Sequence, residues 1–181
     1  MRIQNIEIEL PEVMSKEARA NFRVTVCDIK EEFSHQALGS SGGVEMKVTV
    51  ADGFDTVTFD VIEGSPDNII ASISGSPIDF VTEDALKKYI DICDSYSRAT
   101  RELGPSQIEG IDMARRGLHN DGARKLLDFL QENGHEDLVD FKTARRLFTV
   151  LVISYMQSDT SQKAKPEPGQ GHDDGMILGK H

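Results

Sequence analysis

The densest group of polar side chains in the sequence lies between residues 109 and 121, where acidic, arginine, histidine and asparagine residues alternate with apolar ones. If this stretch is helical, the helical repeat brings several polar side chains into one sector of about 80°. These are Glu109, Asp112, Arg116 and His119. Arg115 falls at the edge of the apolar face, so its partly buried guanidinium needs a carboxylate, a backbone carbonyl or a bound anion as partner.

Two interpretations of this group stay open. The functional interpretation is an anion-binding corner, in which His119 is a candidate general acid or base. Its members are Arg115, Arg116, His119 and Asn120. The structural interpretation is simpler: Asp112 and Arg116 form an ion pair on the helix face, and the helix ends after His119, before a turn at Gly122.

A second arginine doublet, Arg145-Arg146, lies on the last predicted helix. Arg145 falls at the edge of the buried face of that helix, and Arg146 points away from it. Seven of the ten arginines lie between residues 98 and 157, so the two doublets together favour one positive patch. The candidate ligand-binding residues are therefore Asp112, Arg115, Arg116, His119, Asn120 and Arg145.

Other chemistries find little support in the residue spacing. His119 and Asp112 supply at most two metal ligands, so we expect no metal site and no cofactor. Cys93 lies on an apolar stripe, which favours an inert packed thiol, and Cys27 lies off the apolar face of its predicted helix without a histidine nearby in sequence. No glycine-rich phosphate loop and no nucleophile motif of the hydrolases is present.

The charge of the chain is unevenly distributed. The 181 residues carry 20 basic and 31 acidic side chains, for a net charge of −11. Residues 1–97 hold 8 basic and 18 acidic side chains, whereas residues 98–157 hold 9 of each. The overall charge makes nucleic acid an unlikely ligand, and no aromatic residues are interleaved with the arginines.

The chain contains neither an apolar run of membrane-spanning length nor the apolar stretch of a signal peptide near Met1. With two cysteines, it is typical of a cytoplasmic protein. We expect a single domain over residues 1–157 and a disordered tail over residues 158–181, which contain two prolines and four glycines without a periodic apolar pattern.

The amino-terminal half predicts strands and one helix. Residues 3–10 suggest an opening strand, and residues 15–33 have helical spacing with Phe22 and Ile29 on the apolar face. Alternating apolar residues then predict strands over 44–50, 57–61 and 69–73, which form an antiparallel meander.

The carboxy-terminal half is predicted to be helical. A capping sequence at residues 76–79 opens a helix that ends before Gly104-Pro105. Shorter helices follow over residues 106–118 and 123–132, and Asp140 caps a last helix to Met156, with Phe141 and Phe148 on its buried side. The fold class is therefore α+β: a small antiparallel β-meander packed against an amino-terminal helix and three to four carboxy-terminal helices.

Several motifs of the helical half resemble a family of small bacterial proteins that is known as an uncharacterised protein family, with no assigned activity. They are Ile92-Cys93-Asp94-Ser95-Tyr96, residues 105–109, Ile111-Asp112-Met113, residues 115–120 and residues 143–149. The resemblance implies a bacterial, cytoplasmic, one-domain protein and carries over no catalytic residue. Members of the family typically end soon after the last helix, often with a tryptophan, whereas this chain has no tryptophan and continues past it.

The concentration of arginines without a recognisable catalytic set leads to our expectation of a non-catalytic binding or regulatory protein with a protein partner. The alternative is an enzyme that acts on a small phosphorylated or carboxylated substrate, with Arg115 and Arg116 as the anion clamp and His119 as the general acid or base. Self-association is compatible with either function.

Overall fold

Four strands form one sheet in the computed structural model, which describes residues 3–34, 44–63, 69–76, 81, 83–135 and 138–163. The strands are β1 (Ile3–Glu9), β2 (Val44–Val50), β3 (Val57–Ile62) and β4 (Ile69–Gly75), in the sheet order β1-β2-β3-β4. The helices are α1 (Lys16–Ser34), α3 (Glu83–Glu102), α4 (Pro105–Glu132) and α5 (Phe141–Lys163). The predicted α+β fold is confirmed.

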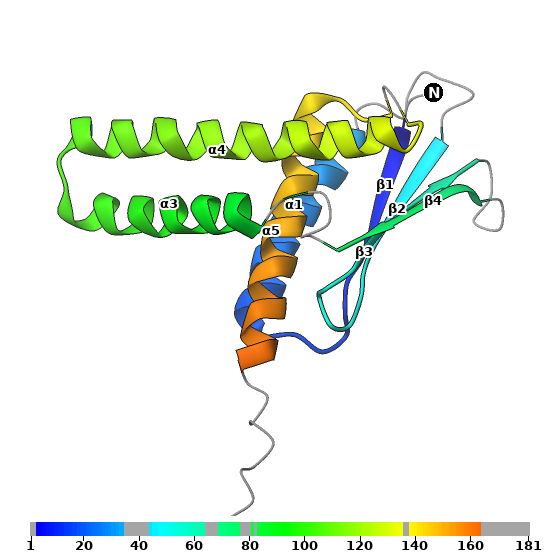
Figure 1. Ribbon diagram of the computed structural model, residues 1–181, viewed down its shortest axis with the longest axis horizontal. Coiled ribbons are helices and arrows are strands. Elements are labelled where there is room, and N and C mark those ends of the chain that lie inside the picture. The colour runs from blue at the N-terminus through cyan, green and yellow to red at the C-terminus, as the bar shows by residue number, and fades with distance from the viewer. Residues whose placement is uncertain are drawn as a thin grey trace, which may run out of the picture.

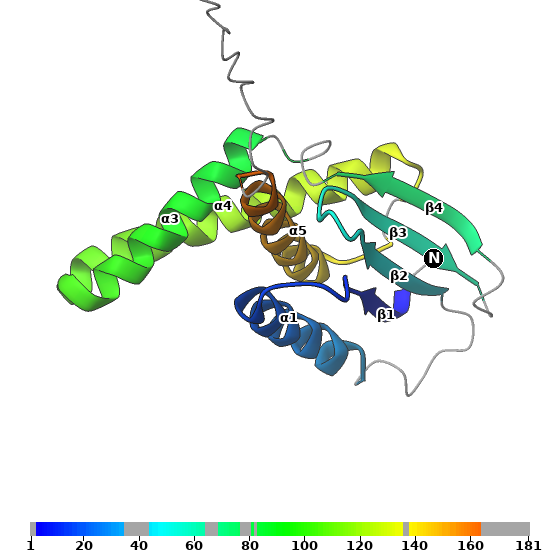
Figure 2. The same ribbon diagram turned by 90° about the horizontal axis from the view of Figure 1, so that it is seen from below.

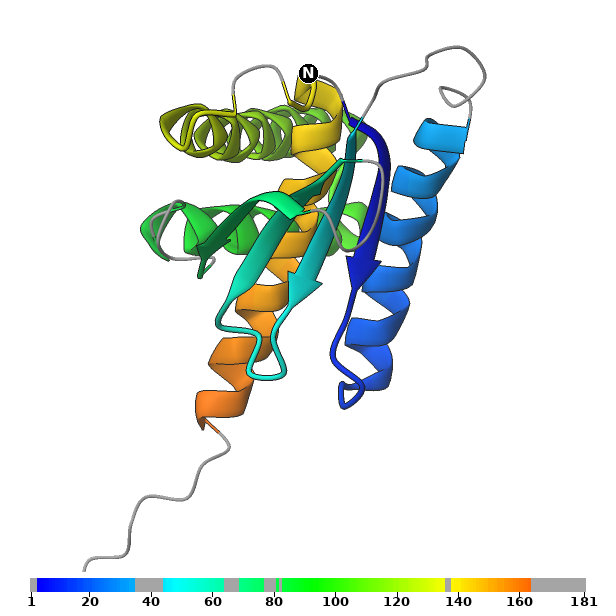
Figure 3. The same cartoon turned by 90° about the vertical axis from the view of Figure 1, so that its right-hand side faces the viewer.

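The sheet is mixed, because β1 runs parallel to β2 while β2, β3 and β4 form the predicted antiparallel meander. A parallel neighbour needs a crossover connection, and α1 supplies it between β1 and β2. The alternating side chains of β2 bury Met46 and Val48 on one face and leave Glu45 exposed on the other. Helices α1 and α5 lie side by side on the buried face (Figure 2), and the same arrangement is seen from the sheet side in Figure 3.

The helical half extends away from the sheet. Helices α3 and α4 lie side by side as a hairpin that projects from the rest of the molecule, and α5 crosses between this hairpin and the sheet (Figure 1). Because α5 contacts neighbours on several sides, it is buried around most of its circumference, as its sequence predicts. One residue of that prediction is wrong: the Phe141 side chain is 39% exposed, and its ring lies 5.7 Å from the Arg124 guanidinium.

The predicted break between two shorter helices is also wrong, because α4 is continuous from Pro105 to Glu132. Gly122, expected to form a turn, lies inside this helix and is buried against the Phe148 ring of α5. A Cβ atom at position 122 would overlap that ring. Glycine is therefore needed for the close approach of two helices at this point, rather than for a change of chain direction.

Some expectations fall on residues outside the described ranges. The capping sequence lies mostly there, at residues 77–80, so the start of its helix stays a prediction; α3 itself begins at Glu83. Helix α5 runs to Lys163, past the Met156 at which we expected it to end. The rest of the predicted tail, residues 164–181, is not described. None of the described helices is both long and apolar enough to cross a bilayer.

Candidate functional site

The half-buried imidazole of His119 lies where α3, α4 and α5 meet. Its ring stacks on Tyr89 of α3, with 5.2 Å between the ring centroids and 20° between the planes. Phe148 of α5 contacts both rings at 5.5 Å. The three aromatic rings therefore join the three helices, and they hold the imidazole in a fixed orientation.

Both imidazole nitrogens of His119 have hydrogen-bond partners on α5. The Arg145 Nε donates to Nδ1 over 3.2 Å, and Nε2 lies 3.1 Å from Thr149 Oγ1. The Thr149 hydroxyl donates in turn to the backbone carbonyl of Arg145 over 3.3 Å. Because a guanidinium can only donate, Nδ1 must be the acceptor, which assigns the imidazole proton to Nε2.

This environment keeps the imidazole uncharged. Burial, followed by the positive charges of Arg145 and Arg115, lowers the pKa of His119 to about 4. At neutral pH the ring is therefore neutral, and its lone pair is occupied by Arg145. A general base needs a free lone pair and a pKa near the working pH, so this histidine is poorly placed for proton transfer.

About two turns before His119 on α4, a single carboxylate binds two arginines. Asp112 Oδ1 accepts from Arg115 Nε at 3.1 Å and Nη2 at 2.7 Å, and its Oδ2 lies 2.6 Å from Arg116 Nη2. These bonds, with that from Arg115 first, lower the pKa of Asp112. The Asp112 side chain is 15% exposed and that of Arg116 is 68% exposed, so the pairs extend from the hairpin interface to the surface.

Arg115 connects this carboxylate to the aromatic group. Its guanidinium lies 4.9 Å from the Tyr96 ring centroid, a cation–π distance, and its positive charge also acts on the Tyr89 hydroxyl. Burial and the neighbouring Cys93 raise the pKa of Tyr89 to about 12, and burial raises the pKa of the Cys93 thiol. Both groups are therefore protonated at neutral pH, which makes Cys93 a poor nucleophile.

In this group of residues the positive charges outnumber the negative ones. Two guanidinium groups, those of Arg115 and Arg116, share the single carboxylate of Asp112, and a third, that of Arg145, lies against His119. Arg145 bonds a neutral imidazole, and among the described residues no carboxylate pairs with it. We call Asp112, Arg115, Arg116 and Arg145 the arginine surface.

Of the candidate residues, the structure brings together Asp112, Arg115 and Arg116 in one cluster and His119 and Arg145 in another. The two clusters are close enough for the positive charge of Arg115 to lower the pKa of His119. Asn120 is half-buried next to His119 on α4. The sequence did not identify Tyr89 and Thr149 as contacts of His119. The spacing of Thr149 could have pointed to it, because Thr149 follows Arg145 by four residues and therefore lies on the same face of the helix.

Two hollows in the described surface lie elsewhere, along α3. The larger, about 510 Å³, is lined by Asp91, Asp94, Ser95, Ser97, Arg98 and Arg101. The smaller, about 240 Å³, is lined by residues of α3 and by Leu103 and Ile111 at the tip of the hairpin. His119 lines neither of them. A search of the described residues finds no group of three side chains suited to a metal ion.

Comparison with known sequences identifies relatives over most of the chain. A protein of Chelativorans sp. is 35% identical over 153 residues, which cover 82% of this chain and 90% of the relative. One of Mesorhizobium japonicum is 35% identical over 84% of this chain and 92% of the relative, and one of Cereibacter sphaeroides is 53% identical over 38% and 41%. All three are UPF0262 proteins, and no solved structure matches the chain. Residues 1–157 match the sequence profile of the uncharacterised protein family UPF0262, and the chain belongs to this family.

Proposed function

We propose that this protein is a non-catalytic cytoplasmic binding or regulatory module, which recognises an acidic segment of a partner protein through the arginine surface. The observation that carries the proposal is the excess of guanidinium groups over carboxylates at the junction of the three helices. Two arginines, Arg115 and Arg116, share Asp112, and a third, Arg145, has a neutral histidine as its hydrogen-bond partner.

A surface of this kind favours carboxylate ligands. A guanidinium offers parallel N–H donors that match the two oxygens of a carboxylate, and its charge cannot be lost at physiological pH. Arg116 is largely exposed, so it can exchange its bond to Asp112 for a bond to a ligand at little cost. Arg115 is held by Asp112 and Tyr96, which keeps the neighbouring positive charge in a fixed position.

The arrangement of His119 supports binding rather than catalysis. A proton donor or acceptor for a substrate needs a ring nitrogen that is free to face it, and both nitrogens of His119 are bonded to α5. The histidine instead sets the position of Arg145, because its lone pair accepts from that guanidinium. An anion clamp made by the same arginines would therefore lack an acid or base beside it.

The test is affinity purification of the tagged chain from its own cells, followed by mass spectrometry, with wild type beside Arg116→Ala. Arg124→Ala is the matched control, because Arg124 lies on the same helix and has its own carboxylate partner, Asp121, at 2.7 Å. We expect one reproducible acidic partner, whose recovery falls with Arg116→Ala and is unchanged with Arg124→Ala.

Two results would contradict the proposal. If nothing is reproducibly recovered with the wild-type chain, the binding module has no partner. If both variants reduce recovery equally, the interaction follows total charge rather than the arginine surface. Melting curves of the variants exclude unfolding as the cause, because both side chains are exposed.

A further inference from the structure

The outer face of α3 carries charges in a symmetrical order. Asp91 and Asp94 precede Tyr96 by five and two residues, and Arg98 and Arg101 follow it by two and five. Ser95 and Ser97 complete the pattern on either side of Tyr96. If the direction of this helix is reversed about Tyr96, each aspartate takes the position of an arginine, and each arginine that of an aspartate.

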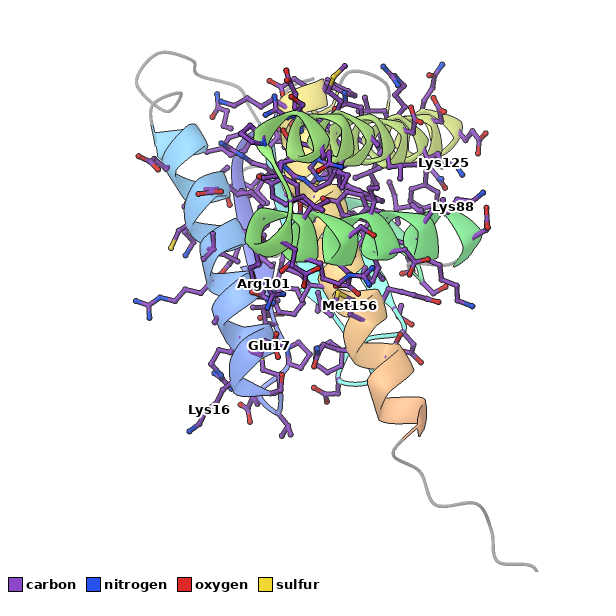
Figure 4. All side chains as sticks on the ribbon, turned by 90° about the vertical axis from the view of Figure 1, so that its left-hand side faces the viewer. Lys16, Glu17, Lys88, Arg101, Lys125 and Met156 are labelled. Carbon is purple, nitrogen blue, oxygen red and sulfur yellow. The ribbon has the colours of Figure 1, made fainter. Side chains whose placement is uncertain are left out.

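These four charges share one face of the helix. With a turn of about 100° per residue, they fall within a sector of about 80° opposite Tyr96. The Tyr96 ring contacts Arg115 of α4, so the charged sector faces away from α4. All four side chains are exposed. Figure 4 shows Arg101 on the side of α3 that is turned away from α4.

The charges on this face do not neutralise one another within the described part of the chain. Arg98 Nη2 lies 3.5 Å from Ser95 Oγ, and Arg101 Nε donates to the backbone carbonyl of Ser97 over 3.1 Å. Neither arginine meets a carboxylate there, although Asp94 precedes Arg98 by the four residues that usually allow an ion pair. The larger hollow of the surface, about 510 Å³, is lined by these four residues and the two serines.

We propose that this face binds a second copy of the same chain, with the two α3 helices antiparallel and related by a twofold axis at the level of Tyr96. In that arrangement Asp91 lies opposite the second copy's Arg101, and Asp94 lies opposite the second copy's Arg98. The axis repeats both contacts, so four ion pairs form across the interface. A parallel arrangement would place like charges together, which selects the antiparallel one.

The projecting hairpin gives this arrangement an apolar contact as well. Under the same twofold axis, Leu103 of the second copy lies level with Tyr89, which contacts Phe148 of α5. Met156 is eight residues beyond Phe148, about 12 Å along the helix axis. A second α3 packed beneath the first lies about 8–10 Å from it, which brings the carboxy-terminal end of that helix close to Met156.

The exposure of Met156 fits such a contact, because 42% of this residue is exposed. Figure 4 shows Met156 and Arg101 on the same side of the molecule, below the hairpin. Exposed ion pairs alone stabilise weakly, so the burial of Met156 against the second copy's α3, repeated on both sides of the axis, supplies the apolar part of the interface.

The test uses charge reversal on the full chain and sedimentation velocity. The acidic variant is Arg98→Asp/Arg101→Asp, and the basic variant is Asp91→Arg/Asp94→Arg. We expect the wild type to be dimeric at ~50 µM, each variant alone to be monomeric, and an equimolar mixture of the two variants to form a heterodimer. The variant with all four charges exchanged restores the pattern in reverse and should dimerise like the wild type. The wild-type dimer should weaken at about 1 M salt, where the Debye length is about 3 Å.

The control is Arg23→Asp/Lys30→Asp on α1, which changes the net charge as much as the acidic variant does, at exposed residues elsewhere. It should remain dimeric. The proposal is overturned if the wild type stays monomeric up to ~200 µM, if either single-sign variant dimerises like the wild type, or if the mixture of the two remains monomeric. Because the heterodimer and the exchanged variant require folded chains, their formation also shows that the substitutions leave the fold intact.

Discussion

The sheet with α1 and the junction of α3, α4 and α5 are built on different principles. The buried side chains of β2 and β3 are all apolar, and the charged side chains of those strands, such as Glu45 and Lys47, lie on the opposite face. In contrast, the junction encloses a neutral histidine, a tyrosine hydroxyl, a thiol and the guanidinium of Arg115.

The difference shows which region can be explained by stability alone and which cannot. Apolar burial accounts for the sheet, since its alternation alone produces a core. A partly buried group of charges is seldom more stable than apolar residues of the same size. Stability therefore gives no reason for the arginine surface, whereas the partner recognition that we propose does.

The largest expected effects come from apolar truncation, and they should be equal in the two regions. Phe59 of the sheet and Phe148 of α5 are both almost completely buried. We expect Phe59→Ala and Phe148→Ala each to lower the free energy of unfolding by about 3–5 kcal/mol. Denaturant titration measures both, and an unchanged midpoint for either would show that its region has a different core.

Next comes the contact between α4 and α5. Gly122→Ala places a methyl group where the Phe148 ring lies, so we expect a loss of about 3 kcal/mol from overpacking. Phe148→Leu in the same chain should recover part of this loss, because the smaller side chain vacates the space. If Gly122→Ala is neutral and the double variant is no better, the two helices do not approach as closely as described.

A pH-dependent effect should distinguish the junction from the sheet. The pKa of His119 is about 4 in the folded protein and about 6.5 in an unfolded chain. The unfolded state therefore binds the proton first as the pH falls, so this histidine removes stability on acidification from about pH 6.5 to pH 4. With allowance for partial exposure, the loss is on the order of 2 kcal/mol.

His119→Gln tests this assignment, because an amide offers an acceptor to Arg145 and a donor to Thr149 without titrating. Thermal melts between pH 7 and pH 4 should show a shallower decline for the variant than for the wild type. Parallel declines would mean that the pKa of His119 is not lowered in the folded state.

The smallest expected effect is at the arginine surface. Arg116→Ala removes a largely exposed ion pair with Asp112, so the free energy of unfolding should change by less than about 1 kcal/mol. A chemical denaturation curve that shifts by more would indicate that Arg116 has a structural role and would weaken the contrast between the two regions.

The sequence predicted the elements whose pattern is local. Alternation placed β2 and β3, and helical spacing placed Phe22 and Ile29 of α1 in the core. It did not predict the direction of β1, since a strand has the same pattern in either direction. It also misplaced Gly122, because a glycine that permits close helix packing looks the same in sequence as one that makes a turn.

The predictions for the candidate site divide in the same way, into local pairs that the sequence indicated and distant contacts that it did not. The pair of Asp112 and Arg116 follows from their spacing of four residues and is confirmed. The partner of Arg115 was left open between three kinds of group, and the structure supplies the carboxylate of Asp112. The partners of His119 are 26 and 30 residues away along the chain, so helical geometry alone could not identify them.

The central claim, that the arginine surface rather than the sheet recognises the partner, is tested most directly by comparing one substituted chain from each region. Arg116→Ala/Arg145→Gln changes the arginine surface, and Glu7→Gln/Glu45→Gln changes exposed charges of the sheet. Quantitative affinity purification should recover the partner with the sheet variant at the wild-type level and lose it with the arginine variant. Loss with the sheet variant and full recovery with the arginine variant would contradict the account.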